Sequence, residues 1–454
     1  MEYLTLQASA DLSSLAREVA VYRGLVRHRE MPEQQAERHS RAYLTFVIVA
    51  LFLVNFVNYM DRMVLSVVIE PIKGELGLSD TQIGLLTGLA FAIFYGSAGL
   101  FIAWLADRFN RKLILTVSMM AWSVMTAITG AAQNFWQLFI ARIGVGVGES
   151  GAIPTSHSII GDYFTTEQRS AILAIFTSGA TLGLMAGLTL GGYVAENYGW
   201  RWSFVAAAVV GLPVILVVGL WLKEPVRGQA DGLVAEPVPP FLSVVRTLFR
   251  IPSYRHLVVM SALSNLAMFG VIQWMPAYLI RQFDMGVAEV GFFFGTALGL
   301  GAAGGAIVGG VVANRLVKRN FMWLVWLPMI SAITIFPLYE FAIFAPNETI
   351  ALLLIMVVNI VGGVSFGPLL TATQTVVAPN MRASASAFVG FVASVIGVGG
   401  GPFIVGILSD HFTPQVGSAT ALQWSLGIVV AATLYSLVHN VFLIRRYKED
   451  RLID

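Results

Sequence analysis

Cysteine is absent from all 454 residues, so neither a disulfide framework nor a thiol-based site is possible. Charge is also scarce: charged residues make up 12% of the chain, and apolar residues make up 57%. A soluble domain of ordinary composition carries about 25% charged residues. The shortage of charge therefore predicts an integral membrane protein and argues against a soluble one.

Several functional signatures are missing as well. No Gly-x-x-x-x-Gly-Lys-Ser/Thr loop is present to hold the phosphates of ATP, and no HExxH motif is present to hold a metal. We therefore expect no metal site, no cofactor, no catalytic residues and no ATP-driven step within this chain. The first residues also lack the basic segment and apolar core of a signal peptide, so the first spanning helix would direct insertion.

The chain does contain a series of apolar stretches. Each is long enough to hold the roughly 20 residues that cross the hydrocarbon core of a bilayer. Gly and Pro interrupt these stretches, which membrane helices tolerate better than soluble ones. The pattern predicts an all-α integral membrane protein with twelve transmembrane helices. The predicted spans are 43–70, 80–107, 111–131, 135–163, 167–196, 201–223, 254–282, 287–317, 321–344, 348–377, 382–411 and 418–447.

The longest polar interruption, residues 224–253, divides these spans six and six. It is rich in proline and charge, so it predicts a linker between two helical bundles. The predicted organisation is a cytoplasmic tail at 1–40, a six-helix bundle at 41–223, a cytoplasmic linker at 224–253, a second bundle at 254–447 and a cytoplasmic tail at 448–454.

The distribution of Lys and Arg predicts the orientation. With both termini inside, only Lys73, Arg201 and Arg281 lie in outer loops. This bias follows the positive-inside rule and predicts a multi-pass protein of a cell membrane, either a bacterial inner membrane or a plasma membrane, with both termini cytoplasmic. Two interpretations of the tail at 1–40 stay open: a solvated segment, or a segment that lies on the anionic inner leaflet.

The two halves look like copies of one another. Asp107, Arg108, Arg111 and Lys112 follow the second span, and Asn314, Arg315, Lys318 and Arg319 follow the eighth at the same spacing. Parallel six-helix repeats with a central site are a transporter architecture.

These residues carry a resemblance to the major facilitator superfamily, which extends over residues 43–447. The segment after the second span resembles the family signature Gly-x-x-x-Asp-Arg-x-Gly-Arg-Lys, with Ala103 and Asn110 in place of its two glycines. The resemblance implies two pseudo-symmetric bundles and alternating access. It also implies a cytoplasmic latch that joins the bundles when the transporter is open outward; the alternative is a loop that only holds the topology. The residues of the implied conformational latch are Asp107, Arg108, Arg111 and Lys112.

A narrower resemblance is to the Spinster-like branch of that family. It rests on three segments: Asn58-Tyr59-Met-Asp61-Arg62, Asp107-Arg108-Phe-Asn-Arg111-Lys112 and Arg142-Ile-Gly-Val-Gly-Val-Gly-Glu149-Ser150. Three further segments fit the same branch: Pro154-Thr155, Gly161-Asp162-Tyr163-Phe164 and Gly199-Trp200-Arg201-Trp202. Animal members of the branch are associated with export of sphingosine phosphate and lysophospholipids. The resemblance thus implies an amphipathic, anionic, lipid-like substrate.

Four ionisable residues interrupt the apolar spans: Asp61 and Arg62 in the first, Arg142 and Glu149 in the fourth. A charge at bilayer depth costs several kcal/mol unless it is paired or lines a water-filled path. Arg142 and Glu149 share a helix face about 10 Å apart, so each needs another partner. We expect Asp61 near Arg142 and Glu149 as a second titratable carboxyl. Arg62 would face the cavity or close its cytoplasmic side.

These charges suggest proton coupling through Asp61 and Glu149, because moving an arginine away from a buried carboxyl favours proton uptake. Guanidinium groups also bind carboxylate and phosphate in a bidentate way. The alternative is a set of static salt bridges that only stabilise packing. The predicted substrate-binding residues are Arg62, Arg142, Tyr59, Asn58, Asn265, Gln273, Trp274 and Asn359.

The preferred hypothesis is a secondary active transporter that moves an amphipathic anion and is coupled to protons. The first alternative is transport of a small organic anion, a carboxylate or a sugar acid. A membrane receptor or sensor on a transporter scaffold is the alternative from another class, and an intramembrane enzyme is a third hypothesis. The expected partners are the substrate, protons and membrane lipids, with no nucleic acid, and we expect a monomer.

Overall fold

The computed structural model describes residues 40–228, 230, 241–378 and 381–451. Three parts of the predicted organisation lie outside the described residues. They are residues 1–39 of the first tail, residues 229 and 231–240 of the linker, and residues 452–454 of the last tail. The described part of the chain contains helices and no strands, which confirms the predicted all-α class.

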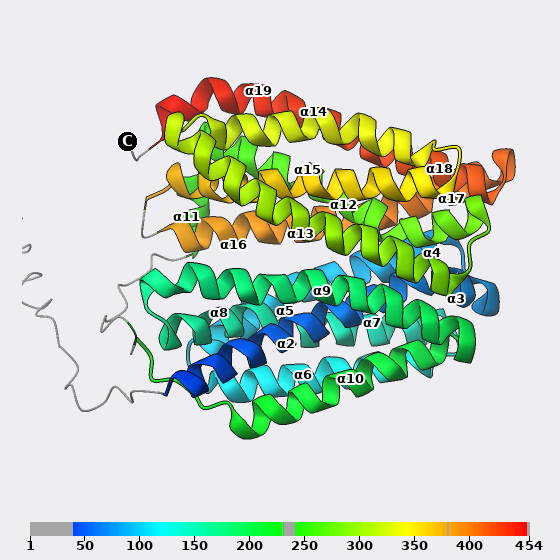
Figure 1. The fold of residues 1–454 in the computed structure, drawn as a ribbon, viewed down its shortest axis with the longest axis horizontal. Helices are drawn as coiled ribbons and strands as arrows, with labels where there is room; N and C mark the ends of the chain where they lie inside the picture. The colour runs from blue at the N-terminus through cyan, green and yellow to red at the C-terminus, as the bar shows by residue number, and fades with distance from the viewer. Residues whose placement is uncertain (1–39, 229, 231–240, 379–380, 452–454) are drawn as a thin grey trace, which may run out of the picture.

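The helices form two groups that follow the order of the chain (Figure 1). The first group is α2 (Arg41–Val67), α3 (Ile69–Leu76), α4 (Asp80–Gly84), the π-helical η2 (Leu85–Leu89), α5 (Ala90–Ala106), α6 (Arg111–Gly130), α7 (Phe135–Glu149), α8 (Ala152–Tyr163), α9 (Thr166–Tyr198) and α10 (Trp200–Trp221). The second group is α11 (Phe241–Leu248), α12 (Pro252–Phe283), α13 (Val287–Arg319), α14 (Trp323–Ile343), α15 (Glu348–Thr375), α16 (Arg382–Val392), η4 (Ala393–Gly400), α17 (Gly401–Val416), α18 (Ser418–Val430) and α19 (Ala432–Asp450).

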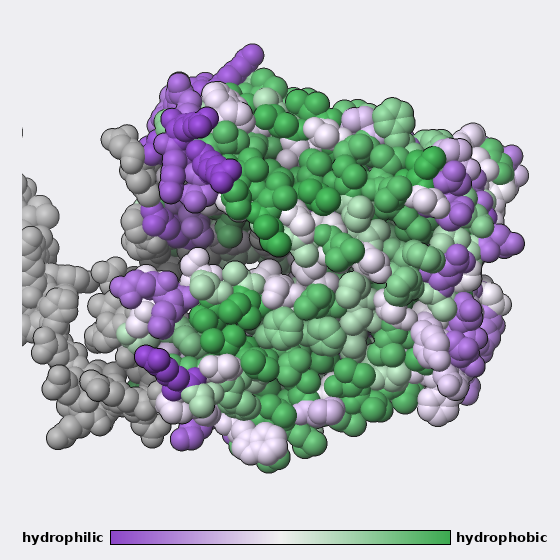
Figure 2. All heavy atoms as spheres, viewed as in Figure 1, coloured by the Kyte–Doolittle hydropathy of each residue, from purple (hydrophilic) through white to green (hydrophobic). Residues whose placement is uncertain are grey.

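Eleven helical segments of the described chain are long and apolar enough to cross a membrane. The remaining predicted span, residues 135–163, is divided into α7 and α8 at Ser150 and Gly151. Pro154 has no N–H to donate to the carbonyl four residues earlier, and Gly151 relaxes the backbone beside it. Figure 2 shows the result on the surface: an apolar belt runs between polar residues at the two ends of the molecule.

We call the two ends the linker end, where α2 begins and α19 finishes, and the far end, which carries Glu75 and Arg281. The linker end is on the left of Figure 1 and the far end on the right. Asn110 starts α6 at the linker end, because its side chain accepts a hydrogen bond from Leu113 N. The asparagine that replaces a signature glycine therefore acts as a helix cap.

At the far end of the first group, Glu75 joins α3 to the start of α10. Its carboxylate accepts hydrogen bonds from Trp200 Nε1 and Arg201 Nη1, each at 2.6 Å. The hydrogen bond from Trp200, together with the bond and charge of Arg201, lowers the pKa of Glu75. Two residues of the Spinster-like Gly-Trp-Arg-Trp segment thus have a direct structural role.

The two groups are held together at the far end by charged contacts. Arg281 of α12 donates to Glu70 of α3 and to Asp80 of α4, at 2.7–2.9 Å. Asp410 of α17 accepts from the backbone N–H groups of Asp80 and Thr81, at 3.0 and 2.7 Å. A carboxylate is favoured at this position because the first N–H groups of a helix have no partner within the helix. Ion pairs and a helix cap therefore close the far end.

Small residues allow α2 and α9 to pack closely. Gly179, Gly183 and Gly187 of α9 lie against α2. A Cβ atom at Gly183 would lie 2.3 Å from Phe56 O, which is far inside van der Waals contact. The four-residue repeat of glycine therefore sets the distance between these two helices.

The first prediction follows from this contact. We expect Gly183→Ala to lower the free energy of unfolding by about 1–3 kcal/mol, because the added methyl group forces α2 and α9 apart. Thermal melting of the purified protein measures the effect. Gly161→Ala is the matched control, since a Cβ at Gly161 meets nothing within 4 Å. Equal melting temperatures for the two variants would show that the close approach does not set stability.

The second prediction concerns the far end. Arg281→Ala removes charged hydrogen bonds worth about 1.5–3 kcal/mol each. The population of molecules with a closed far end, relative to those with an open far end, should therefore fall about tenfold or more. Spin labels on Tyr198→Cys of the first half and Gln282→Cys of the second half report the distance between the halves at the far end. The absence of native cysteine keeps the labelling specific. Arg446→Ala is the control, because the Arg446–Glu449 pair lies within α19. An unchanged distance distribution in Arg281→Ala would contradict the closing role.

Candidate transport site

The centre of the first group holds a buried ion pair between α2 and α7. Arg62 Nη2 lies 2.6 Å from Glu149 Oε2, and Arg62 Nε lies 3.1 Å from the same oxygen. Glu149 has no exposed surface and Arg62 is 7% exposed. The last residue of α7, just before the helix break, thus neutralises the guanidinium of α2.

Aromatic rings surround the Arg62 guanidinium. Its central carbon lies 4.8 Å from the ring centroid of Tyr59, 4.7 Å from that of Phe91 and 5.1 Å from that of Tyr95. Asn58 Oδ1 accepts a longer hydrogen bond from Arg62 Nη2, at 3.5 Å. The faces of aromatic rings attract cations, so this cage holds Arg62 in place while leaving it hydrogen-bond donors for an anion.

Asp61 points away from this pair, as adjacent helix positions about 100° apart require. Thr126 of α6 donates a long hydrogen bond of 3.5 Å to Asp61 Oδ2, and Asp61 Oδ1 has no partner. The side chain is buried, at 2% exposure. A carboxyl group without an ion-pair partner among the described residues therefore lies beside the Arg62–Glu149 pair.

Arg142 lies close enough to Asp61 for their charges to interact, but it has no ion-pair partner among the described residues. Its Nε has no hydrogen-bond partner, and its guanidinium lies 5.2 Å from the ring of Phe91, the ring that also contacts Arg62. Within the part of the chain that the structure describes, no ion pair joins Asp61 to Arg142. The ion pair that forms joins Arg62 to Glu149, while Asp61 and Arg142 interact only through their charges, with no hydrogen bond or ion pair between them. The rotation of α2 decides this, because it turns Arg62 towards α7 and Asp61 towards α6.

Gln273 and Trp274 of α12 are both buried, but they differ in their hydrogen bonds. Gln273 is 5% exposed, and its Nε2 has no partner. Its backbone oxygen accepts a hydrogen bond at 3.1 Å from Oγ of Ser66, which lies one turn after Arg62 on α2. Trp274 has no exposed surface and donates to Pro402 O at 2.8 Å. The role of each residue in substrate binding stays a prediction.

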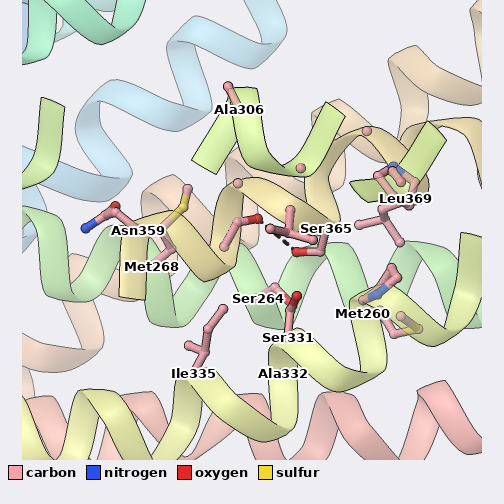
Figure 3. A pocket seen from close by; sticks show the side chains of 18 of the residues that line it. Met260, Ser264, Met268, Ala306, Ser331, Ala332, Ile335, Asn359, Ser365 and Leu369 are labelled. Carbon is pink, nitrogen blue, oxygen red and sulfur yellow. Dashed lines mark hydrogen bonds between the residues drawn. The ribbon is translucent and has the colours of Figure 1, made fainter. Parts of the chain in front are cut away.

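A cavity of about 820 Å³ lies mainly within the second group of helices. Residues of α12, α13, α14, α15 and α19 line it, together with Thr177 and Thr181 of α9. Asn265 and Asn359 are among them, whereas Asn58, Tyr59, Arg62, Arg142, Gln273 and Trp274 are not. In Figure 3, Asn359 and Met268 lie at one end of this cavity, and Leu369 and Met260 lie at the other.

The predicted site residues therefore lie in three places. The first half holds the charged cluster with Asn58 and Tyr59, Asn265 and Asn359 line the second-half cavity, and Gln273 and Trp274 are buried outside that cavity. Sequence reasoning missed the residues that α19 contributes to the cavity, Thr433, Ser436 and Asn440. Their spacing of three and four residues places them on one face of a helix, and this signal could have identified them.

The predicted latch residues lie at the linker end. Arg111 is buried and bonds to Asp162 of the first half, and to Glu224 Oε1 and Pro225 O at the start of the linker, each at 2.8 Å. Asp107, Arg108 and Lys112 have no hydrogen bond to the second half among the described residues. Arg108 stacks on Trp104, with 4.1 Å from its central carbon to the ring centroid. The latch role stays a prediction, and in this conformation the latch does not join the halves.

One segment matches the Gly-x-Ser-x-Gly letter pattern of hydrolase nucleophiles: residues 363–367. It lies inside the continuous helix α15, and Ser365 Oγ donates to Gly362 O at 2.9 Å. A hydrolase nucleophile requires a sharp strand-to-helix turn that exposes the serine oxygen. The pattern here has no such turn and does not indicate catalysis.

Comparison with known proteins identifies the architecture. Residues 51–402 match the family model of the Major Facilitator Superfamily. An MFS-type efflux pump of Mycolicibacterium smegmatis is 33% identical over 91% of this chain and 96% of that protein. The sphingosine-1-phosphate transporter SPNS2 of Danio rerio is 28% identical over 85% of this chain and 80% of that protein. A probable L-galactonate transporter of Escherichia coli is 26% identical over 92% of each.

A solved structure shares the fold. It is a bacterial homolog to the human lysosomal transporter Spinster, in an inward-facing and unoccupied conformation. The TM-score is 0.81 and the identity is 28%, over 91% of this chain and 100% of that one. The predicted resemblance to the Spinster-like branch and the predicted fold of two six-helix bundles are confirmed.

The third prediction concerns the buried ion pair. Glu149→Gln leaves the Arg62 guanidinium buried without a counter-charge, so we expect it to destabilise the protein by about 3–5 kcal/mol. The double variant Arg62→Leu/Glu149→Leu removes both charges and should recover most of that loss. Thermal melting of purified protein measures both effects. A double variant no more stable than the single one would show that the pair is not the stabilising unit.

Proposed function

Because the chain belongs to the major facilitator superfamily and is a Spinster-like transporter, not an enzyme, we propose that it moves an amphipathic, anionic, lipid-like substrate across the membrane. We further propose alternating access coupled to protons, with Asp61 and Glu149 as the coupling residues. The observation that carries this proposal is the buried Arg62–Glu149 pair, next to a carboxyl and a guanidinium that have no ion-pair partner among the described residues.

The ion pair supports coupling because its two members respond to different ligands. An anionic head group competes with Glu149 for the donors of Arg62. A carboxylate that loses its counter-charge in a buried position takes up a proton, since leaving it ionised would cost far more. Anion binding at Arg62 and proton binding at Glu149 would therefore favour one another. Asp61, with only a long hydrogen bond, would be the second proton acceptor.

The second half supports an amphipathic substrate. The cavity there has about 820 Å³ of space, within the roughly 300–1,000 Å³ that is common for small-molecule sites. Methionine, leucine, isoleucine and alanine side chains account for much of its wall. A substrate with a charged head near Arg62 and Arg142 and an apolar tail in this cavity would use both groups of predicted residues.

The second candidate is a small organic anion. The probable L-galactonate transporter among the relatives favours it, because a sugar acid carries a carboxylate that suits the same arginines. Such a substrate would need the charged cluster but would not fill the apolar cavity.

We also propose that the protein functions as a monomer with its linker end in the cytoplasm. The excess of Lys and Arg in segments of the linker end supports this orientation. Asp107, Arg108, Arg111 and Lys112 would then close the cytoplasmic side in the opposite conformation.

The fourth prediction tests the substrate and the coupling together. Proteoliposomes with an imposed pH gradient should transport labelled sphingosine 1-phosphate or a lysophospholipid. Asp61→Asn and Glu149→Gln should lose the response to the gradient while each variant still binds the lipid, because neither removes a guanidinium.

The matched control is Glu449→Gln, which alters an exposed acid outside the charged cluster whose ion pair with Arg446 lies within α19. Transport of galactonate or a hexuronate, with no flux of either lipid, would replace the lipid substrate by the sugar acid. Unchanged pH dependence in both variants of the cluster would remove the coupling proposal.

A further inference from the structure

The second-half cavity has polar side chains of its own, contributed by α19. Ser436 and Asn440 line the cavity and are each 1% exposed. Ser436 Oγ and Asn440 Oδ1 have no hydrogen-bond partner. Buried polar groups normally have partners, and each unpaired one is costly. Two unpaired oxygens on the wall of one cavity therefore mark a place for a ligand.

The orientation of Asn440 defines what that ligand must offer. Its Nδ2 donates to Ser436 O at 3.1 Å, so the free atom is the oxygen, which only accepts hydrogen bonds. A phosphate or a carboxylate has no proton to donate to this atom. A hydroxyl or an amide N–H does, and Ser436 Oγ could exchange a second hydrogen bond with the same group.

The rest of the lining is consistent with a neutral ligand group. Among the described lining residues, Lys318 at the linker end is the only charged one. Thr433 and Ser331 already donate to backbone oxygens of Val430 and Val361, at 2.7 and 3.2 Å. Among the described residues that line the cavity, the fully buried side-chain atoms without a hydrogen-bond partner are Ser436 Oγ and Asn440 Oδ1.

We propose that Ser436 and Asn440 form a subsite for a neutral hydrogen-bond donor, a hydroxyl or an amide N–H, carried by an amphipathic molecule. The inference deepens the proposed function, because the occupant would be the neutral part of the transported substrate. It assigns this part to the second half, away from the arginines of the first half.

A matched pair of probes tests the subsite. N-oleoylethanolamine carries one amide N–H and one hydroxyl, and its N-methyl, O-methyl derivative keeps the tail and the acceptors but has no donor. Tritiated N-oleoylethanolamine bound to the purified full-length protein is displaced by either compound in a scintillation proximity assay. We expect the methylated compound to bind about tenfold more weakly, since it loses two hydrogen bonds.

The variants locate the effect. In Ser436→Ala and Asn440→Leu the ratio of the two affinities should fall towards one. Ser425→Ala is the control, because Ser425 is equally buried in α18, bonds to Ala421 O of its own helix and does not line the cavity. Its ratio should stay at the wild-type value. Equal affinities of the two probes for the wild-type protein, or an unchanged ratio in both cavity variants, would overturn the proposal.

A second measurement does not depend on the folding of any variant. A diazirine on the ethanolamide head group should label wild-type peptides that contain Ser436 or Asn440; labelling confined to α2 or α7 would overturn the subsite. Arg142→Ala should leave the probe ratio unchanged, because Arg142 does not line the cavity. In the wild-type protein, no flux of the lipid anions together with different affinities for the two probes would reject the proposed substrate alone. Intact flux with a ratio of one would reject the subsite alone.

Discussion

A carboxylate with no exposed surface inside a membrane-spanning helix has to be neutral or paired, and Glu149 meets this requirement through Arg62. The pair fixes α2 against the end of α7, where Gly151 and Pro154 break the fourth span. The aromatic rings of Tyr59, Phe91 and Tyr95 complete the environment of the guanidinium from α2 and α5. Three segments of the first half are thus placed by one charge interaction.

The contacts between the halves differ at the two ends of the molecule. At the far end, Arg281 and Asp410 bridge the halves, and Ser66 connects the helix of Arg62 to the backbone of α12. At the linker end, the hydrogen-bond partners of Arg111 lie in its own half and at the start of the linker, and none among the described residues lies in the second half. Packed interfaces switch between discrete arrangements, so breaking one set of contacts and forming another is a natural route to alternating access. Ser66 lies one turn from Arg62, so a change at the ion pair would reach the far-end interface directly.

The sequence predicted the membrane class, the spans and the family because each depends on composition and spacing. It did not predict the partner of Glu149. Asp61 and Arg62 are adjacent, and the rotation of α2 that turns one towards α7 and the other towards α6 is set by packing, in part by the glycines of α9. Gly151 and Pro154 are residues that favour a helix break, but the apolar run continues past them, so the sequence predicted one span where the structure has α7 and α8. The cavity was out of reach because five helices of the second half, far apart in the chain, form its wall.

The two halves are related by a sequence repeat, yet they differ in the charge that they offer to a substrate. The polar residues of the linker-end motif recur in both copies, but the second half has no counterpart of the charged cluster within the described spans that line its cavity. If the two halves served one small polar anion, charge on both sides of the substrate would be expected. Instead, charge lies on one side, while on the other a largely apolar cavity ends in two unpaired neutral oxygens. That asymmetry fits a molecule with chemically different ends, because each half then desolvates only the part of the ligand that it can satisfy.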